Sequence, residues 1–160
     1  MSFENAEKDL IAKGFGSSIL VLNDSTATVE LAAKAIHVEP GRIAKTLSFY
    51  GKDKPFLILT EGTSRIDNHK FKEQFHMKAK MIPSDEVENV IGHAPGGVCP
   101  FGIKKGIDVY LDQSLLKYDI VYPAAGDDHS AVKLTIKELQ LCSCAKGWVD
   151  VCREPVSPSQ

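Results

Sequence analysis

The chain has 160 residues, 43% of them hydrophobic, which is enough for one domain with a substantial core. Lysines and arginines number 19 and aspartates and glutamates 21, and the formal charge of −2 excludes the strongly basic surface of an autonomous nucleic-acid binder. The chain has no run of 18 apolar residues, and residues 1–7 lack the features of a secretory signal. We therefore expect a cytoplasmic protein that binds neither membrane nor DNA.

Hydrophobic spacing along the chain predicts pairs of strands that helices interrupt. In chain order, the expected elements are a helix over 3–11, a strand over 18–22, a helix over 25–37, a hairpin of strands over 42–50 and 55–60, a helix over 67–76, a short strand at 81–82, a helix over 84–92, strands over 107–111, 120–124 and 131–135, a helix that begins at 135, and a strand over 148–152.

Local signals place the ends of several of these helices. Ser84 is expected to cap one helix that Gly92 ends, and Thr135 with Glu138 forms a capping box for the last helix. The elements do not alternate strictly as βαβ, so we expect one mixed, largely antiparallel α/β domain over residues 1–160. Residues 153–160 are rich in proline and serine and are expected to fray.

Lys45 places a charge on the apolar face of the strand predicted over 42–50. Side chains alternate in a strand, so Lys45 shares its face with Ile43, Leu47 and Phe49. An ammonium group on such a face is costly unless it is paired or the strand lines a cleft. Two interpretations follow, a lysine at the sheet rim that extends its amine to water, or a cation inside a binding pocket.

A loop rich in glycine and proline covers residues 93–106. Its four glycines and two prolines exclude a helix or a regular strand. Pro95 and Pro100 stiffen the loop, whereas Gly96 and Gly97 allow its backbone to approach a ligand closely. The loop is neither a Walker A motif nor a dinucleotide-binding fingerprint. An ordinary surface connection is the alternative, although long ordered loops are often functional.

Three segments in this order resemble a known family. They are Ile43-Ala44-Lys45-Thr46-Leu47, Gly96-Gly97-Val98-Cys99-Pro100-Phe101-Gly102 and Ala124-Ala125-Gly126. The chain resembles the YbaK/EbsC family, which includes free-standing deacylases of mischarged tRNA and is similar to the editing domain of bacterial prolyl-tRNA synthetases. The resemblance runs from residue 25 to residue 139 and implies a barrel-like mixed sheet flanked by helices, with no cofactor.

The resemblance also implies a site. The catalytic lysine of the family corresponds to Lys45, and its Gly-x-x-x-Pro loop corresponds to residues 96–100. Family members commonly carry serine where this chain has Cys99, which leaves the amino-acid selectivity open. The catalytic residues that we expect are Lys45, Gly96, Gly97 and Cys99. The substrate-binding residues that we expect are Thr46, Val98, Pro100, Phe101, Gly102, Gly126, His129 and Ser130.

The implied reaction is hydrolysis of the ester between a small amino acid, such as cysteine or alanine, and the terminal ribose of tRNA-Pro. The chain has no Gly-x-Ser-x-Gly elbow and no metal motif. Backbone N–H groups near residues 96–99 would stabilise the oxyanion, and Lys45 would hold a phosphate or ester oxygen. Given the net charge, we expect contact with the tRNA acceptor end only, and a partner such as prolyl-tRNA synthetase would bind the rest. A non-catalytic module that binds an aminoacyl or nucleotide end is the alternative.

The cysteines are consistent with a reduced chain. Cys142 and Cys144 lack a second cysteine pair, and the histidines lie far away in sequence, so we expect no metal site. Cys99 lies in the suspected loop, where a nucleophilic thiol would need a base. His93 is the nearest candidate base in sequence, which leaves a thiol enzyme as a further alternative.

Several polar segments have both a structural and a functional interpretation. Residues 127–130 form either a polar turn between strands or the mouth of the pocket. The basic residues of segment 65–72 and the pair Lys104-Lys105 are either solvated surface or contacts for phosphate groups.

Overall fold

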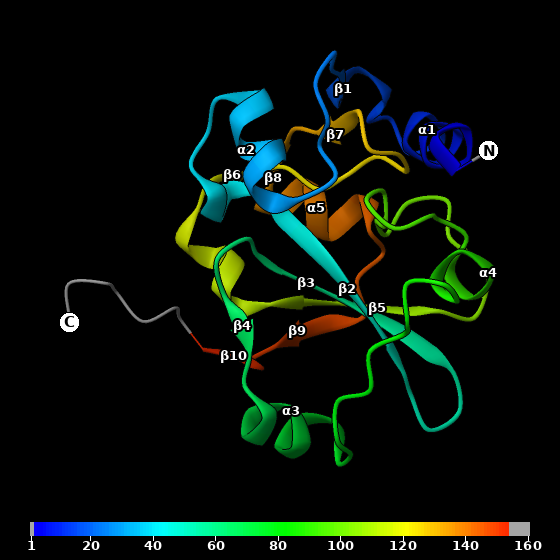
Figure 1. The fold of residues 1–160 in the computed structure, drawn as a ribbon, viewed down its shortest axis with the longest axis vertical. Helices are drawn as coiled ribbons and strands as arrows, with labels where there is room; N and C mark the ends of the chain where they lie inside the picture. Colours follow the sequence, from blue (N-terminus) through cyan, green and yellow to red (C-terminus); the bar gives the residue numbers. More distant parts are fainter. Residues whose placement is uncertain (1, 154–160) are drawn as a thin grey trace.

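The computed structural model describes residues 2–153, and a mixed four-stranded sheet forms its centre (Figure 1). The strand order is β2 (Ala44–Tyr50), β3 (Pro55–Glu61), β5 (Asp108–Asp112) and β9 (Gly147–Val149). The β2–β3 hairpin is antiparallel as predicted, whereas β3–β5 and β5–β9 are parallel. The mixed α/β class is confirmed. The barrel-like expectation is wrong, because this sheet has open edges at β2 and β9 and does not close.

The other strands form short antiparallel pairs around this sheet. They are β1 (Ile19–Val21) with β7 (Ser130–Val132), β6 (Ile120–Val121) with β8 (Leu134–Thr135), and β4 (Arg65–Ile66) with β10 (Cys152–Arg153). The single strand predicted over 148–152 is therefore two strands, β9 and β10. The chain leaves the central sheet where the N–H of Val151 donates to Asp112 Oδ1 at 2.8 Å. Arg153 lies in β10, and residues 154–160 of the expected tail lie outside the described residues.

Five α-helices and three 3-10 helices flank the strands in the described part of the chain. The α-helices are α1 (Ser2–Ala12), α2 (Val29–Ile36), α3 (Asn68–Phe75), α4 (Val87–Ile91) and α5 (Ile136–Cys142). The 3-10 helices are η1 (Gly16–Ser18), η2 (Pro40–Arg42) and η3 (Gln113–Lys117). None of the helices in residues 2–153 is long and apolar enough to cross a membrane.

Helix ends confirm some local predictions and correct others. The capping box of Thr135 and Glu138 is present, and Gly92 ends α4 with a φ of 110°. The predicted cap at Ser84 is wrong, because the carbonyl of Pro83 accepts the N–H groups of Glu86 and Val87, and this turn delays the helix. Helix α2 begins four residues later than predicted, since Thr28 is its N-cap.

The two faces of the central sheet carry separate parts of the core. Leu57 and Leu59 of β3 pack into the main cluster, whereas Phe56 and Ile58 pack on the opposite face. The period of two along a strand produces this division. A third, smaller cluster joins α2 to the start of β2, where Ile43 forms a parallel bridge to Tyr122. This third cluster underlies the candidate site.

Candidate functional site

A cavity of about 190 Å³ opens beside the start of β2. Its walls come from the residues before and in α2, the first residues of β2, the glycine-rich loop, and the segment between β6 and β7. The lining residues are Thr26, Ala27, Thr28, Val29, Ala32, Ile43, Ala44, Lys45, Thr46, Gly96, Val98, Tyr122, Ala124, Ser130 and Ala131. These distant segments meet because Ile43 bridges to Tyr122 and Ala124 pairs with Ala131.

Lys45 is half-buried in the wall of this cavity. Its Nζ donates a hydrogen bond to the carbonyl oxygen of Ser64 at 2.5 Å. Burial is the main cause that lowers the pKa of Lys45; the carboxylate of Glu61 opposes this effect and the guanidinium of Arg65 adds to it. An ammonium group has three donors, so Lys45 keeps two for a ligand.

Among the hydroxyl-bearing residues that line the cavity, Thr46 and Ser130 differ in their bonding. Thr46 Oγ1 is buried and has no hydrogen-bond partner among the described residues. Such an unpaired polar atom normally costs stability, which marks Thr46 as a candidate ligand-binding residue. Ser130 is buried as well, but its Oγ donates to Asp127 Oδ1 at 2.6 Å. Ser130 therefore stabilises the turn at 127–130.

The glycine-rich loop offers backbone donors at the cavity. The N–H of Gly97 donates to the carbonyl of Ala94 at 3.0 Å and is therefore used within the loop. The N–H groups of Gly96 and Val98 donate to no residue in the described part of the chain, and both residues line the cavity. Two of the backbone donors that we expected near residues 96–99 thus have no hydrogen-bond acceptor within residues 2–153.

Gly97 itself packs against protein and does not line the cavity. A Cβ at this position would lie 2.6 Å from the backbone nitrogen of Asp127 and 2.6 Å from the carbonyl carbon of Gly126. Real Cβ atoms do not approach backbone this closely, so only glycine lets the loop lie directly on the turn at 126–127. Gly97 thus sets the position of Gly96 and Val98.

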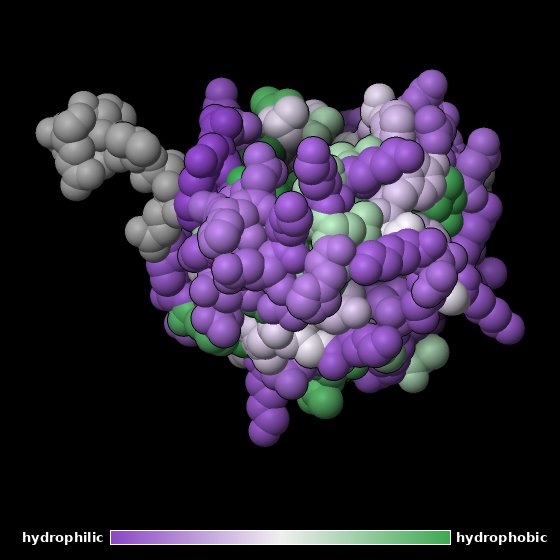
Figure 2. All heavy atoms as spheres, turned by 90° about the horizontal axis from the view of Figure 1, so that it is seen from below, coloured by the Kyte–Doolittle hydropathy of each residue, from purple (hydrophilic) through white to green (hydrophobic). Residues whose placement is uncertain are grey.

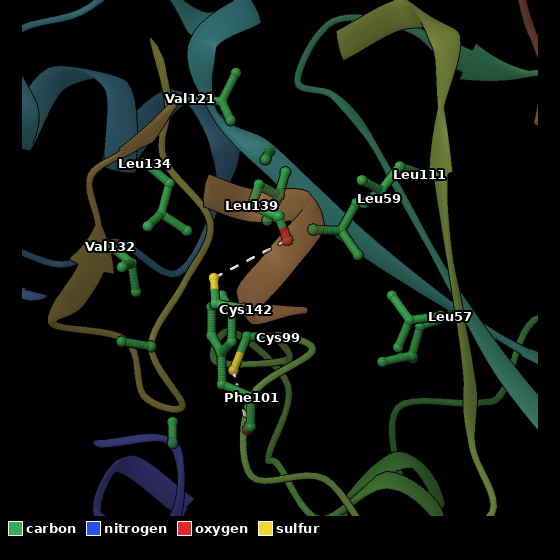
Figure 3. Close-up of a cluster of buried hydrophobic side chains, with 14 of the residues drawn as sticks. Leu57, Leu59, Cys99, Phe101, Leu111, Val121, Val132, Leu134, Leu139 and Cys142 are labelled. Carbon is green, nitrogen blue, oxygen red and sulfur yellow. Dashed lines mark hydrogen bonds between the residues drawn. The ribbon is translucent and has the colours of Figure 1, made fainter. Parts of the chain in front are cut away.

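Cys99 lies in the main core instead of the cavity. Figure 3 shows its sulfur among buried side chains, with a hydrogen bond to Phe101, and its exposed fraction is 0%. The Cys99 Sγ lies 3.5 Å from His93 Nε2 and donates to the carbonyl of Phe101 at 3.6 Å. Burial raises the pKa of the Cys99 thiol to about 12, and burial lowers the pKa of His93. The pair therefore lacks the exposed thiolate that nucleophilic chemistry requires.

The other expected residues do not line the cavity. Pro100 and Phe101 are buried, and the N–H of Gly102 donates to Asp9 Oδ2 at 2.9 Å, which ties the loop to α1. Gly126 accepts a hydrogen bond from Ser2 Oγ. His129 is exposed, with Nδ1 2.8 Å from Asp128 Oδ1. The expected residues that do line the cavity are Lys45, Thr46, Gly96, Val98 and Ser130.

Some cavity residues were missed from the sequence. Thr28 caps α2 by accepting the N–H of Leu31 at 3.2 Å, so a threonine directly before an apolar run was a usable signal for this wall. Tyr122 reaches the cavity through a long-range bridge to Ile43, for which no local signal exists. Within residues 2–153, no group of three His, Cys, Asp or Glu side chains is placed to hold a metal ion.

A family model covers every residue that lines the cavity. This model, described as an aminoacyl-tRNA editing domain, matches residues 23–142. The chain is 48% identical over 131 residues to the uncharacterised Bacillus subtilis protein YwhH, covering 81% of this chain and 83% of that protein. It is 27% identical over 107 residues to the proline–tRNA ligase of Limosilactobacillus fermentum, covering 63% of this chain but only 19% of the ligase.

A solved structure resembles the fold over nearly its full length. This crystal structure of a proposed trans-editing enzyme for prolyl tRNA synthetase has a TM-score of 0.85 and 32% sequence identity. The match covers 95% of this chain and 97% of the other.

Proposed function

The chain belongs to the family of aminoacyl-tRNA editing domains, and we propose that it acts in trans as a hydrolase that removes a small amino acid from mischarged tRNA-Pro. The observation that carries this proposal is the cavity itself. It combines a half-buried cation, Lys45, with the free backbone N–H groups of Gly96 and Val98. Such a set can bind an ester whose carbonyl oxygen becomes negatively charged during hydrolysis.

The size of the cavity supports a small amino acid. A protein cavity of about 150 Å³ can hold benzene, so a cavity of about 190 Å³ holds a small side chain with its ester group. Seven of the fifteen lining residues are alanine or valine, including Ala32, Ala131 and Val98, which suits alanine or cysteine as the bound amino acid. One methylene changes binding in such a site by about 1–3 kcal/mol, so exclusion of larger groups is the stronger means of discrimination.

The hydrolysis needs no covalent enzyme intermediate. Water adds to the ester carbonyl carbon, and the resulting oxyanion accepts hydrogen bonds from the N–H groups of Gly96 and Val98. Lys45 supplies positive charge, through its two remaining donors, to the oxyanion or to the terminal phosphate. The bond from the carbonyl carbon to the ribose oxygen then breaks, that oxygen takes up the proton that the attacking water has lost, and the free amino acid leaves. The neighbouring ribose hydroxyl assists the attacking water.

The binding partner in this proposal is the acceptor end of tRNA. The formal charge of −2 provides no broad basic surface for a whole tRNA. The proline–tRNA ligase relative is much longer than this chain, and the match covers only 19% of the ligase. We therefore propose that prolyl-tRNA synthetase, or another partner, holds the remainder of the tRNA.

A deacylation panel tests the proposal. The purified chain is incubated with tRNA-Pro that carries alanine, cysteine, serine or proline, and release of the free amino acid is measured over time. We expect release of alanine or cysteine and no release of proline. Protection of every ester from spontaneous hydrolysis would instead identify a non-catalytic binding module, and this outcome would refute the proposed reaction.

A further inference from the structure

The short ribbon of β4 and β10 places two arginines side by side. Arg65 and Arg153 are direct cross-strand partners, next to the partner pair of Ile66 and Cys152. Side chains of directly opposite residues in antiparallel strands share a face, with Cβ atoms about 4.5–5.5 Å apart. Ile66 and Cys152 pack on the core cluster around Phe71, whereas both arginines are exposed, so the arginine pair faces outward.

This arrangement is unfavourable in the protein alone. Like charges directly opposite each other destabilise a pair of strands. Neither guanidinium group has an ion pair or hydrogen bond with a residue in the described range 2–153. Asp67 lies within electrostatic range of Arg153, but its Oδ1 accepts the N–H of Lys70 and caps α3. Asp150 is bound to the Nζ of Lys70 at 3.2 Å. The two arginines therefore have capacity for an external anion.

The arginine pair adjoins the catalytic cavity. Arg65 directly follows Ser64, whose carbonyl oxygen accepts the hydrogen bond from Lys45 Nζ at 2.5 Å. The charge of Arg65 also contributes, after burial, to the lowered pKa of Lys45. Lys45, Arg65 and Arg153 thus form a series of neighbouring cations that leads from the cavity to the outer face of the ribbon. Figure 1 shows this ribbon on the same side of the molecule as α3, and Figure 2 shows that the face seen from the α3 side is mostly hydrophilic.

We propose that Arg65 and Arg153 bind the phosphate backbone of the tRNA acceptor strand and thereby position its esterified end in the cavity. This inference rests on the proposed function. An ester bound beside Lys45 is attached to a strand that must leave through the mouth of the cavity, and each nucleotide of that strand carries a phosphate. Guanidinium groups match phosphate geometry with two parallel hydrogen bonds. Two adjacent arginines also give a chain with a formal charge of −2 a local site for RNA. Both are positioning residues, since neither lines the cavity.

RNA binding without an amino acid tests this inference independently of hydrolysis. The probe is a fluorescein-labelled RNA hairpin with the acceptor-stem sequence of tRNA-Pro and an uncharged single-stranded 3′ end, and fluorescence anisotropy measures its Kd across a salt series. The variant is Arg65→Gln/Arg153→Gln. The control is Lys133→Gln/Lys137→Gln, which removes the same charge from two exposed lysines.

We expect the arginine variant to bind the hairpin at least about tenfold more weakly than wild type. The slope of log K against log salt should flatten by about 0.7 for each phosphate that the variant no longer neutralises. The Tm of the variant should be unchanged or rise by up to about 4 °C, because the like-charge pair is removed. The lysine control should bind as wild type does. Equal affinity and salt slope for the arginine variant and wild type would overturn the inference, as would equal weakening in both variants.

Discussion

Gly97→Ala tests how the site is positioned, because the added Cβ meets only backbone. It would lie 2.6 Å from two backbone atoms of residues 126 and 127, and neither can move without shifting the turn that carries Ser130. Overpacking of this kind costs about 1–3 kcal/mol. For a chain of this size each kcal/mol lowers Tm by about 2–4 °C, so we expect a fall of about 2–12 °C.

The matched control is Gly147→Ala, where no atom lies within 4 Å of the added Cβ. This variant should keep the Tm of the wild type within about 2 °C. Differential scanning calorimetry measures both. The Gly97→Ala chain should also release amino acid more slowly at a temperature where it is folded, because Gly96 and Val98 move with the loop. Wild-type Tm and wild-type kinetics in Gly97→Ala would refute the close packing and the positioning role derived from it.

Three further predictions concern single side chains and are checked in the same preparations. With a pKa of about 12, about one Cys99 thiol in 10⁴ is ionised at pH 8. Iodoacetamide should therefore modify the exposed Cys144 first and leave deacylation intact. Rapid inactivation that accompanies modification of Cys99 would instead support the thiol mechanism. Thr46→Val removes an unpaired buried hydroxyl, so the free energy of unfolding should stay constant or rise by about 1 kcal/mol. The KM for aminoacyl-tRNA should increase, and an unchanged KM would contradict a role of Thr46 in ligand binding. Burial lowers the pKa of Lys45 in the folded protein below its ordinary 10.5, so the unfolded chain binds more protons between these two values. The free energy of unfolding of the wild type, relative to that of Lys45→Met, should therefore increase as pH rises toward 10.5. Urea titrations measure both values, and a difference that stays constant across pH would contradict the lowered pKa.

Elements defined by local chemistry were predictable from the sequence. The β2–β3 hairpin follows from alternating apolar residues around a turn, and the capping box of Thr135 and Glu138 needs only four consecutive residues. The short strands were harder to predict, because their pairing depends on distant partners. The N–H of Val151 finds Asp112, 39 residues earlier, and this bond lies at the break in the predicted final strand.

In the candidate site, too, features set by local sequence were predictable, and features set by distant contacts were not. Alternation in the strand placed Lys45 on a face shared with apolar residues, and this residue does line a cavity. Sequence proximity within the loop could not separate Val98, which lines the cavity, from Cys99, which is buried in the core. These neighbouring residues lie in different surroundings because contacts of the loop with α1 and with the turn at 126–127 fix its path. Tyr122 entered the site through strand pairing alone.

The rate of amino-acid release from Ala-tRNA-Pro by wild type and Lys45→Ala is the most direct test of the proposed chemistry. Thermal unfolding first establishes that both chains are folded, since removal of a half-buried charge need not destabilise the protein. We predict rapid release of alanine by the wild type and a loss of at least about a hundredfold in Lys45→Ala, on the scale of losing one group that stabilises an oxyanion. Release at the wild-type rate by a folded Lys45→Ala chain would contradict the assignment of Lys45 as the cation of this site.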